Sequence, residues 1–236
     1  MNSIIDECIA DLRAVGVRGV EVYGRKLRQN QGNAERFADL LFEGRAAWVL
    51  QQSSIQITLR DRPDLLMSLG GEIVGAEVKH FLEKEQDRLD DNAMARVADV
   101  LVPIGDTTTE GAQPWEQICS VAVKKAKAGQ YLENVPNILI VESSSEALQE
   151  MTETAVNQYY DELHRSRNDP LLRGLLRRLN GIMLVNTRSV GFSATGPYNV
   201  EFCEIYDHAV PMSKNVIEAI RNVGLGLPFR PTVLGY

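Results

Sequence analysis

Residues 62–81 read RPDLLMSLGGEIVGAEVKHF, and in this stretch two apolar runs flank the pair Gly70-Gly71. A two-glycine connection between apolar runs is a signal for a β-hairpin with a two-residue turn, because glycine accepts the positive φ angles that such turns require. If the two glycines form the turn, Leu69 pairs with Glu72 across the hairpin. The stretch therefore predicts two antiparallel strands in a defined register.

Three charged side chains fall on one face of this hairpin. The register places Asp64 directly opposite Glu77, and Lys79, two residues further on, shares the face of Glu77. Like charges in opposition destabilise a sheet, whereas a divalent cation such as Mg²⁺ binds carboxylate oxygens and turns repulsion into ligation. The alternative is a solvated strand end at which Lys79 neutralises both acids. The apolar residues around Glu77 favour the metal site, because they make this strand part of the core.

The composition is that of a globular protein. The 236 residues are 44% hydrophobic and 24% charged, which is enough for one large domain or two small ones. No apolar run reaches the ~20 residues of a membrane span, and residues 1–10 lack the basic start of a secretory signal. The three cysteines are scattered, which argues against a disulfide framework or a zinc site. These features predict a cytoplasmic protein without a membrane partner.

The net charge of −7 does not favour binding to nucleic acid, because a basic surface usually supplies most of the affinity. The charge is nevertheless segregated along the chain. Residues 83–99 are mainly acidic, whereas residues 165–178 contain a series of arginines with Asp169 as the only acid. A local basic patch is therefore compatible with this sequence.

Hydrophobic periodicity and capping residues predict the other elements. We expect helices at residues 3–14, 33–43, 115–131, 143–164, 170–179 and 213–222. We expect strands at residues 45–59, 137–141, 181–186 and 199–205. Gly44 is expected to end the second helix, and Asp169 to cap the helix that begins with Pro170. Residues 15–32 are expected to be an arm or a loop, and residues 83–98 a helix or a mobile excursion.

The order helix, three strands, helix, strand surrounds Pro63-Asp64, twelve further residues and Glu77-Val78-Lys79. This combination resembles the PD-(D/E)XK nuclease superfamily, which contains restriction endonucleases, archaeal Holliday-junction resolvases and many DNA-repair exonucleases. The resemblance covers residues 34–141. It implies an α/β fold with a restriction-endonuclease-like core, a central mixed sheet flanked by helices, and extra C-terminal strands and helices. The expected organisation is a single nuclease-like domain, residues 1–236, with its core at about 33–141 and a C-terminal extension at 142–236.

The resemblance implies a role for each residue of the motif. Asp64 and Glu77 match the acids that bind Mg²⁺ or Mn²⁺, with the Val78 carbonyl as a further ligand. Lys79 matches the lysine that orients or deprotonates the attacking water and offsets phosphate charge. The implied reaction is metal-dependent hydrolysis of phosphodiester bonds in DNA, leaving 5′-phosphate and 3′-hydroxyl ends.

Two further candidates come from the neighbouring helices. Glu35 matches the first-helix glutamate of resolvase-like members, a role that Asp39 or Glu43 also fits. Gln130 lies where some exonuclease members carry a Gln-x-x-x-Tyr motif. Here it is followed directly by Tyr131, so that motif is not reproduced.

The lysines of the helix at 115–131 are expected to point mostly outward. Lys124 and Lys127 are candidates for contact with a phosphate backbone, and ordinary solvated lysines are the alternative. Lys125 is grouped with them on the outer side of this helix.

Two other functions remain open beside the DNA nuclease. One is a binding or interaction module that keeps the nuclease-like fold without turnover, which the acidic balance and the missing Gln-x-x-x-Tyr favour. The other is a resolvase-like homodimer that acts on branched DNA. A protein partner or an oligomer is one possible source of the positive charge that DNA binding requires. The sequence contains no Walker-A loop, no Gly-x-Gly-x-x-Gly after a strand, no His-Glu-x-x-His and no Cys-x-x-Cys.

Overall fold

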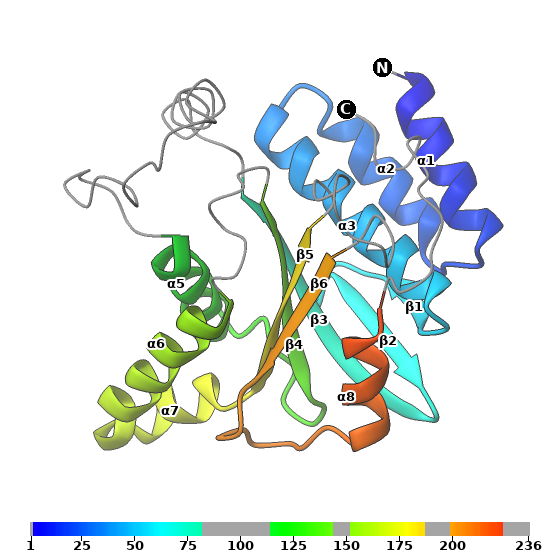
Figure 1. Cartoon of the computed structure of the whole chain (residues 1–236). Coiled ribbons are helices and arrows are strands. Elements are labelled where there is room, and N and C mark those ends of the chain that lie inside the picture. The colour runs from blue at the N-terminus through cyan, green and yellow to red at the C-terminus, as the bar shows by residue number, and fades with distance from the viewer. Residues whose placement is uncertain (1, 82–113, 144–151, 187–198, 224–236) are drawn as a thin grey trace, which may run out of the picture.

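The computed structural model describes residues 2–81, 114–143, 152–186 and 199–223. They form an α/β fold with one mixed, open sheet of six strands between two layers of helices (Figure 1). The strands lie in the sheet in chain order: β1 (Gln56–Leu59), β2 (Leu65–Leu69), β3 (Glu72–Phe81), β4 (Asn137–Ser143), β5 (Leu179–Asn186) and β6 (Asn199–Glu204). The pairs β3–β4 and β4–β5 are parallel and the others antiparallel. The expected α/β class with a mixed sheet is confirmed.

The helices divide between the two faces of this sheet. One face carries α1 (Asn2–Ala14), α2 (Val20–Gln29), α3 (Ala34–Gln52) and α8 (Lys214–Arg221). The other carries α5 (Pro114–Lys127), α6 (Thr152–Arg165) and α7 (Pro170–Leu176), with the 3-10 turn η2 (Ser166–Asn168) joining the last two. Figure 1 shows the sheet between the layers. None of the helices in the described ranges is both long and apolar enough to cross a membrane.

Strand β4 shows why both layers form. Ile138 and Ile140 pack into the core below α1–α3, whereas Leu139 and Val141 pack into the core below α5 and α6. All four side chains are completely buried. A central parallel strand with both faces covered is expected to be a continuous apolar run, so the strand predicted at residues 137–141 is confirmed.

The hairpin has the register that the two glycines predict. Leu69 pairs with Glu72, and the pairing continues to Leu65 and Ala76. Gly70 and Gly71 have φ angles of 58° and 87°, the left-handed region that favours glycine. Ala76 pairs with the first residue of β2, and β3 continues beyond this point to Phe81 without a partner in β2. This overhang of β3 positions the candidate site described below.

Residues 15–32 are largely helical, so the predicted arm or loop is wrong. Val20, Tyr23 and Leu27 recur at helical spacing and are buried against α1 and α3. Gly24 lies inside this helix, at a position where a Cβ would run into the Ile9 side chain of α1. The glycine permits close packing of two helices rather than a turn.

The second helix continues far beyond Gly44, so its predicted end and the strand predicted at residues 45–52 are also wrong. Helix α3 runs to Gln52, and only Gln56–Leu59 form the strand β1. Its second half is buried on every side, from Phe42 to Leu50. A helix that is buried all round loses its apolar periodicity and cannot be told from a buried strand by pattern alone.

Gly44→Ala is expected to destabilise the protein by about 1–3 kcal/mol, the usual cost of overpacking a core. A Cβ at this position would overlap the hydroxyl of Tyr23, which donates a 2.7 Å hydrogen bond to the Leu40 carbonyl. Urea denaturation would measure the loss, and Tyr23→Phe in the same chain should recover part of it. Gly174→Ala is the matched control, because a Cβ there meets nothing within 4 Å. Equal stability of Gly44→Ala and wild type would contradict the packing argument.

The remaining elements follow their capping residues. Asp169 accepts a hydrogen bond from the N–H of Leu172 at the start of α7, and Ser213 accepts one from the N–H of Val216 at the start of α8. The strands predicted at residues 181–186 and 199–205 are confirmed as β5 and β6. The predictions for residues 83–98, and for residues 144–151 of the helix expected at 143–164, lie outside the described residues.

Candidate functional site

The candidate site lies at the C-terminal part of β3, which extends beyond Leu65, the first residue of β2. There the N–H of Val78 donates to Oδ2 of Asp64 at 2.9 Å, and the N–H of His80 donates to Oδ1 of Asp39 at 3.3 Å. Backbone groups of a buried strand need partners, and two carboxylates supply them at this open edge. Asp64 from the β1–β2 loop and Asp39 from α3 therefore both lie beside the overhang of β3.

The two acids of the hairpin converge, but on a lysine that the sequence placed elsewhere. Nζ of Lys125, from α5, lies 2.6 Å from Oε2 of Glu77 and 3.7 Å from Oδ2 of Asp64. The side chains of Lys125 and Glu77 are only 15% and 2% exposed. The outward orientation predicted for Lys125 is therefore wrong, and this ammonium neutralises the acid pair.

Lys79 has a different partner. Its Nζ lies 2.9 Å and 3.0 Å from the two carboxylate oxygens of Asp39 on α3. It therefore does not neutralise Asp64 and Glu77 in the manner of the solvated strand end considered above. Asp39 holds both the Lys79 ammonium and the N–H of the next residue, His80. This double contact fixes the end of the Lys79 side chain beside the overhanging strand.

Helix α3 brings Glu43, rather than Glu35, to the site. Glu43 is 2% exposed, and burial raises its pKa to about 8, with the nearby charge of Asp64 adding to the rise. Arg36 partly offsets this, with its Nη2 3.7 Å from Oε1 of Glu43. Glu35 lies exposed in the first turn of the same helix. Of the alternatives that the sequence left open, Asp39 and Glu43 are the acids of α3 beside the overhang.

Glu77 is a second acid of the site whose pKa is shifted by its surroundings. Its pKa is raised to about 7, mainly by burial and then by the nearby charge of Asp64, while the Lys125 ammonium opposes the rise. Its Oε1 is buried and has no hydrogen-bond partner among the described residues. A buried acceptor without a donor is uncommon in proteins and is a ready ligand for a cation.

Gln130 and Tyr131 hold the end of the helix that carries Lys125. The N–H of Gln130 donates to the Lys125 carbonyl at 3.0 Å, and the buried Tyr131 hydroxyl donates to the Ala122 carbonyl. Among the described residues no hydrogen bond or ion pair joins either side chain to Asp64 or Glu77, although the Glu77 charge helps to raise the pKa of the buried Tyr131. Their observed contacts are structural, and a catalytic role for Gln130 remains a prediction.

A buried ionic link ties α3 to the ends of β3 and β4. Nη1 of Arg45 donates to Oε1 of Glu142 at 2.7 Å, and Nδ1 of His80 lies 3.0 Å from the other oxygen of that carboxylate. All three residues are almost fully buried. Breaking such a pair leaves an uncompensated charge inside the protein, so this link fixes α3 against the overhang.

The donor set fits a divalent cation in one respect and opposes it in another. Asp64 and Glu77 converge, and the unpartnered Oε1 of Glu77 offers a vacant acceptor. Lys125 already supplies a positive charge to both acids, however. Across the described ranges, no three His, Cys, Asp or Glu side chains are arranged to hold a metal ion. Binding a cation here requires Lys125 to give way.

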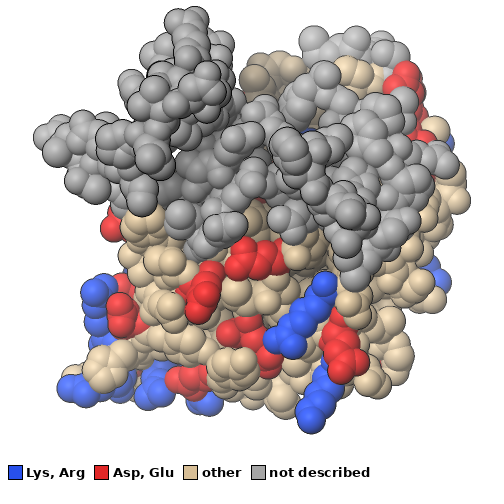
Figure 2. Space-filling view, viewed as in Figure 1, with Lys and Arg blue, Asp and Glu red and all other residues tan. Residues whose placement is uncertain are grey.

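Four of the five arginines of residues 165–178 pair with acidic side chains, whereas Arg167 is exposed. Arg173 and Arg177 both pair with Asp207, Arg178 pairs with Glu133, and Arg165 pairs with Glu162. Figure 2 shows acidic and basic side chains interspersed over the described part of one face. Helix α7 also leads into the start of β5, at the opposite end of the sheet from the overhang (Figure 1).

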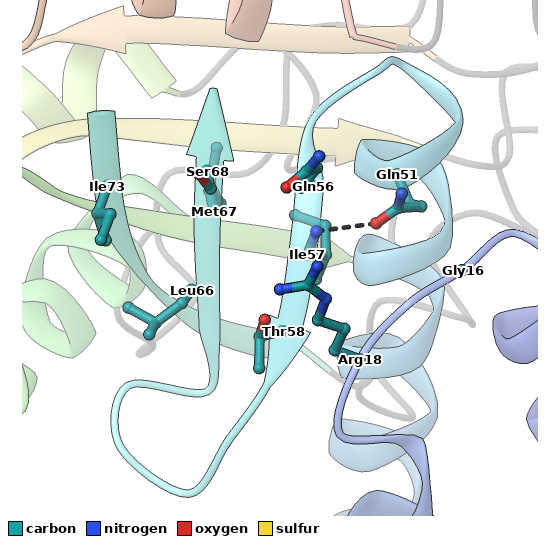
Figure 3. A pocket seen from close by; sticks show the side chains of 10 residues that line it. All are labelled: Gly16, Arg18, Gln51, Gln56, Ile57, Thr58, Leu66, Met67, Ser68 and Ile73. Carbon is teal, nitrogen blue, oxygen red and sulfur yellow. Dashed lines mark hydrogen bonds between the residues drawn. The ribbon is translucent and has the colours of Figure 1, made fainter. Parts of the chain in front are cut away.

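A hollow of about 320 Å³ lies at the other edge of the sheet, beside β1 and β2 (Figure 3). It is lined by Gly16, Arg18, Gln51, Gln56, Ile57, Thr58, Leu66, Met67, Ser68 and Ile73. Gln51 accepts a hydrogen bond from the N–H of Ile57, and Arg18 pairs with β1 through its backbone. These contacts close the outer edge of β1. The lining of this hollow contains no carboxylate, histidine or cysteine and none of the predicted site residues.

No protein-family model matches the chain, and no curated protein or solved structure matches it either.

Proposed function

We propose that this protein hydrolyses phosphodiester bonds in DNA with the help of a divalent cation, Mg²⁺ or Mn²⁺, held by Asp64 and Glu77. The observation that carries the proposal is the convergence of these two carboxylates where β3 outruns β2, with Oε1 of Glu77 buried and lacking a donor. The order α3, β1–β2–β3, α5, β4 supports a restriction-endonuclease-like core as part of the same proposal.

The residues around the overhang have distinct roles in this reaction. A bound cation would polarise the phosphodiester and lower the pKa of a water molecule. Asp64 and Glu77 would hold this cation, with the Val78 carbonyl as a third ligand. Lys79 orients the attacking water and stabilises the charge that develops on the phosphate. Asp39 holds the Lys79 ammonium in place.

A second candidate is a binding module that keeps the fold without turnover. Its support is the Lys125 ammonium at 2.6 Å from Glu77, which gives the acid pair an internal partner. The pairing of four of the five arginines at residues 165–178 with acids adds to this view, because it reduces the positive charge that this segment offers to DNA. In this case Asp64, Glu77 and Lys125 form a structural ionic cluster.

Incubation with DNA separates the two functions. Supercoiled plasmid, linear duplex and a four-way junction would be incubated with the protein in Mn²⁺, and in EDTA as the control. The nuclease proposal expects Mn²⁺-dependent cleavage that leaves 5′-phosphate ends. Selective cleavage of the junction by a protein that sediments as a dimer would identify a resolvase. No cleavage of any substrate by folded protein would favour the binding module.

Asp39→Asn is expected to reduce the cleavage rate at saturating DNA by about tenfold or more, because a misplaced catalytic group loses much of its effect. The amide retains an oxygen for the N–H of His80 but loses the charge that holds Lys79. The affinity for Mn²⁺, measured by calorimetry, should not change. Glu35→Gln, on the exposed side of the same helix, should leave both quantities at their wild-type values. A wild-type rate in Asp39→Asn would show that Asp39 does not position Lys79.

A further inference from the structure

Lys125 occupies the place between Asp64 and Glu77 that a cation would need. Its Nζ is 2.6 Å from Oε2 of Glu77 and 3.7 Å from Oδ2 of Asp64. These are distances of ion pairing, and the lysine side chain is largely buried. A third acid, Glu43, lies near enough that the Lys125 charge lowers its pKa. Lys125 is therefore the cation that holds this acidic cluster together when no metal is bound.

The position of Lys125 on α5 accounts for this contact. Ile118 and Ala122 of α5 are buried against the sheet, and Val121 is partly buried beside them. Lys125 is one turn further along the same stripe, three and four residues after Ala122 and Val121. Its aliphatic stem follows the helix face, and its ammonium reaches the carboxylates at the end of the stripe. The neighbouring Lys124 is exposed on the same helix.

We propose that Lys125 sets the metal affinity of this site: its ammonium is a tethered competitor that a divalent cation must displace from Asp64 and Glu77. The inference rests on the proposed function, because it assumes that these two acids bind the cation. Two positive groups cannot share the same pair of carboxylates without strong repulsion at this separation. The Lys125 side chain is long and flexible, so its ammonium moves away from the pair when the cation enters.

Two consequences follow for the metal-free and metal-bound protein. Without metal, removal of the Lys125 charge leaves two adjacent acids unpaired, and the protein should melt at a lower temperature. With metal, the same removal abolishes the competition, and the cation should bind more tightly. A lysine with a merely structural role would produce the first effect without the second.

Calorimetric titration with Mn²⁺ alone tests the proposal on the full chain without DNA. Lys125→Met is expected to tighten Mn²⁺ binding by about tenfold or more, because it removes a unit charge within a few ångströms of the site. Its melting temperature in EDTA should fall, and Mn²⁺ should raise that temperature further than it does in wild type. Lys124→Met is the matched control and should bind Mn²⁺ as wild type does. Lys125→Gln, which keeps a donor for Glu77, serves the same purpose if the methionine variant does not fold.

The outcomes test the competitor role of Lys125 separately from the proposed metal site at Asp64 and Glu77. Tighter binding in Lys125→Met that disappears when Asp64→Asn is added would support both. Equal Mn²⁺ affinity in wild type and in the folded Lys125 variants would overturn the competitor role and leave the metal site intact. No Mn²⁺ binding by wild type or by the Lys125 variants would overturn the competitor role and the proposed metal site together.

Discussion

Asp64→Asn and Glu77→Gln are each expected to reduce Mn²⁺-dependent DNA cleavage by roughly a hundred- to a thousandfold, with the protein still folded. Each change replaces a carboxylate by a neutral amide of the same shape, so the cation loses one of the two charges that hold it. Glu77 matters most, because its Oε1 is buried without a donor and its carboxyl faces Asp64. Plasmid cleavage rates and circular dichroism would measure activity and folding.

The chain offers a close control for this prediction. Asp61 lies in the same loop as Asp64, but its side chain is exposed and pairs with Lys26. Asp61→Asn makes the same change of charge and should leave cleavage unaltered. Wild-type rates in both Asp64→Asn and Glu77→Gln, with Mn²⁺ still required, would place the metal at other residues. Loss of activity in all three variants would indicate a general effect of charge rather than a site.

The hairpin was predictable because its determinants are local. Two glycines specify the turn, and the side-chain period of a strand then fixes which residues oppose each other. The structure has this register from Leu69–Glu72 to Leu65–Ala76, and just beyond it Asp64 and Glu77 both lie beside the Lys125 ammonium. The capped helices α7 and α8 were predictable for the same reason, since Asp169 and Ser213 bond to N–H groups three residues away.

The partners of the acids depend on tertiary packing and were not recognised. Lys125 falls three residues after Ala122 and seven after Ile118, which is the spacing of the buried face of α5. That spacing was visible in the sequence, but a lysine was assigned to solvent because of its charge. Asp39 and Glu43 were considered with Glu35 as one row of acids. Only the packing of α3 on β3 distinguishes the two that face the overhang from the one that faces water.

In the helical layer, glycine serves close packing between helices rather than turns. The sequence predicts a loop around Gly24 and a helix end at Gly44. Each glycine instead lies inside a helix, where a neighbouring side chain leaves no space for a Cβ. The neighbours are Ile9 and Tyr23, which are distant in sequence. Glycine is favoured both in turns and where two helices pack closely, and the local sequence does not distinguish these two cases. The boundary of α3 therefore required knowledge of the packing between α1, α2 and α3.

Glu43→Gln is expected to stabilise the metal-free protein at neutral and alkaline pH. Burial raises the pKa of Glu43 from its usual 4.5 to about 8, and the charge of Asp64 opposes its ionisation. Ionising this carboxyl inside the protein is therefore costly, whereas glutamine fills the same space without a charge. The gain should be small near pH 5, where the folded protein keeps Glu43 protonated, and should grow as the pH rises.

The sign of the pH dependence follows from whether Glu43 is protonated in the folded and in the unfolded protein. Between pH 4.5 and about 8 the unfolded chain has lost the Glu43 proton while the folded protein retains it. Deprotonation then favours the unfolded state, so the free energy of unfolding falls as the pH rises through this interval and levels off above it. A raised pKa of this size corresponds to a loss on the order of 5 kcal/mol, because each unit of pKa difference is worth about 1.4 kcal/mol.

Urea denaturation of wild type and Glu43→Gln from pH 5 to pH 9 in EDTA would measure this loss. Glu77, whose pKa is also raised, contributes to the slope in both proteins, so the difference between the two curves isolates Glu43. Glu35→Gln, an exposed position on the same helix, should follow wild type at every pH. Parallel curves for wild type and Glu43→Gln would mean that Glu43 ionises in the folded protein as it does in water. Divergence toward alkaline pH would show that α3 places a buried, protonated carboxyl, that of Glu43, beside Asp64 and Glu77.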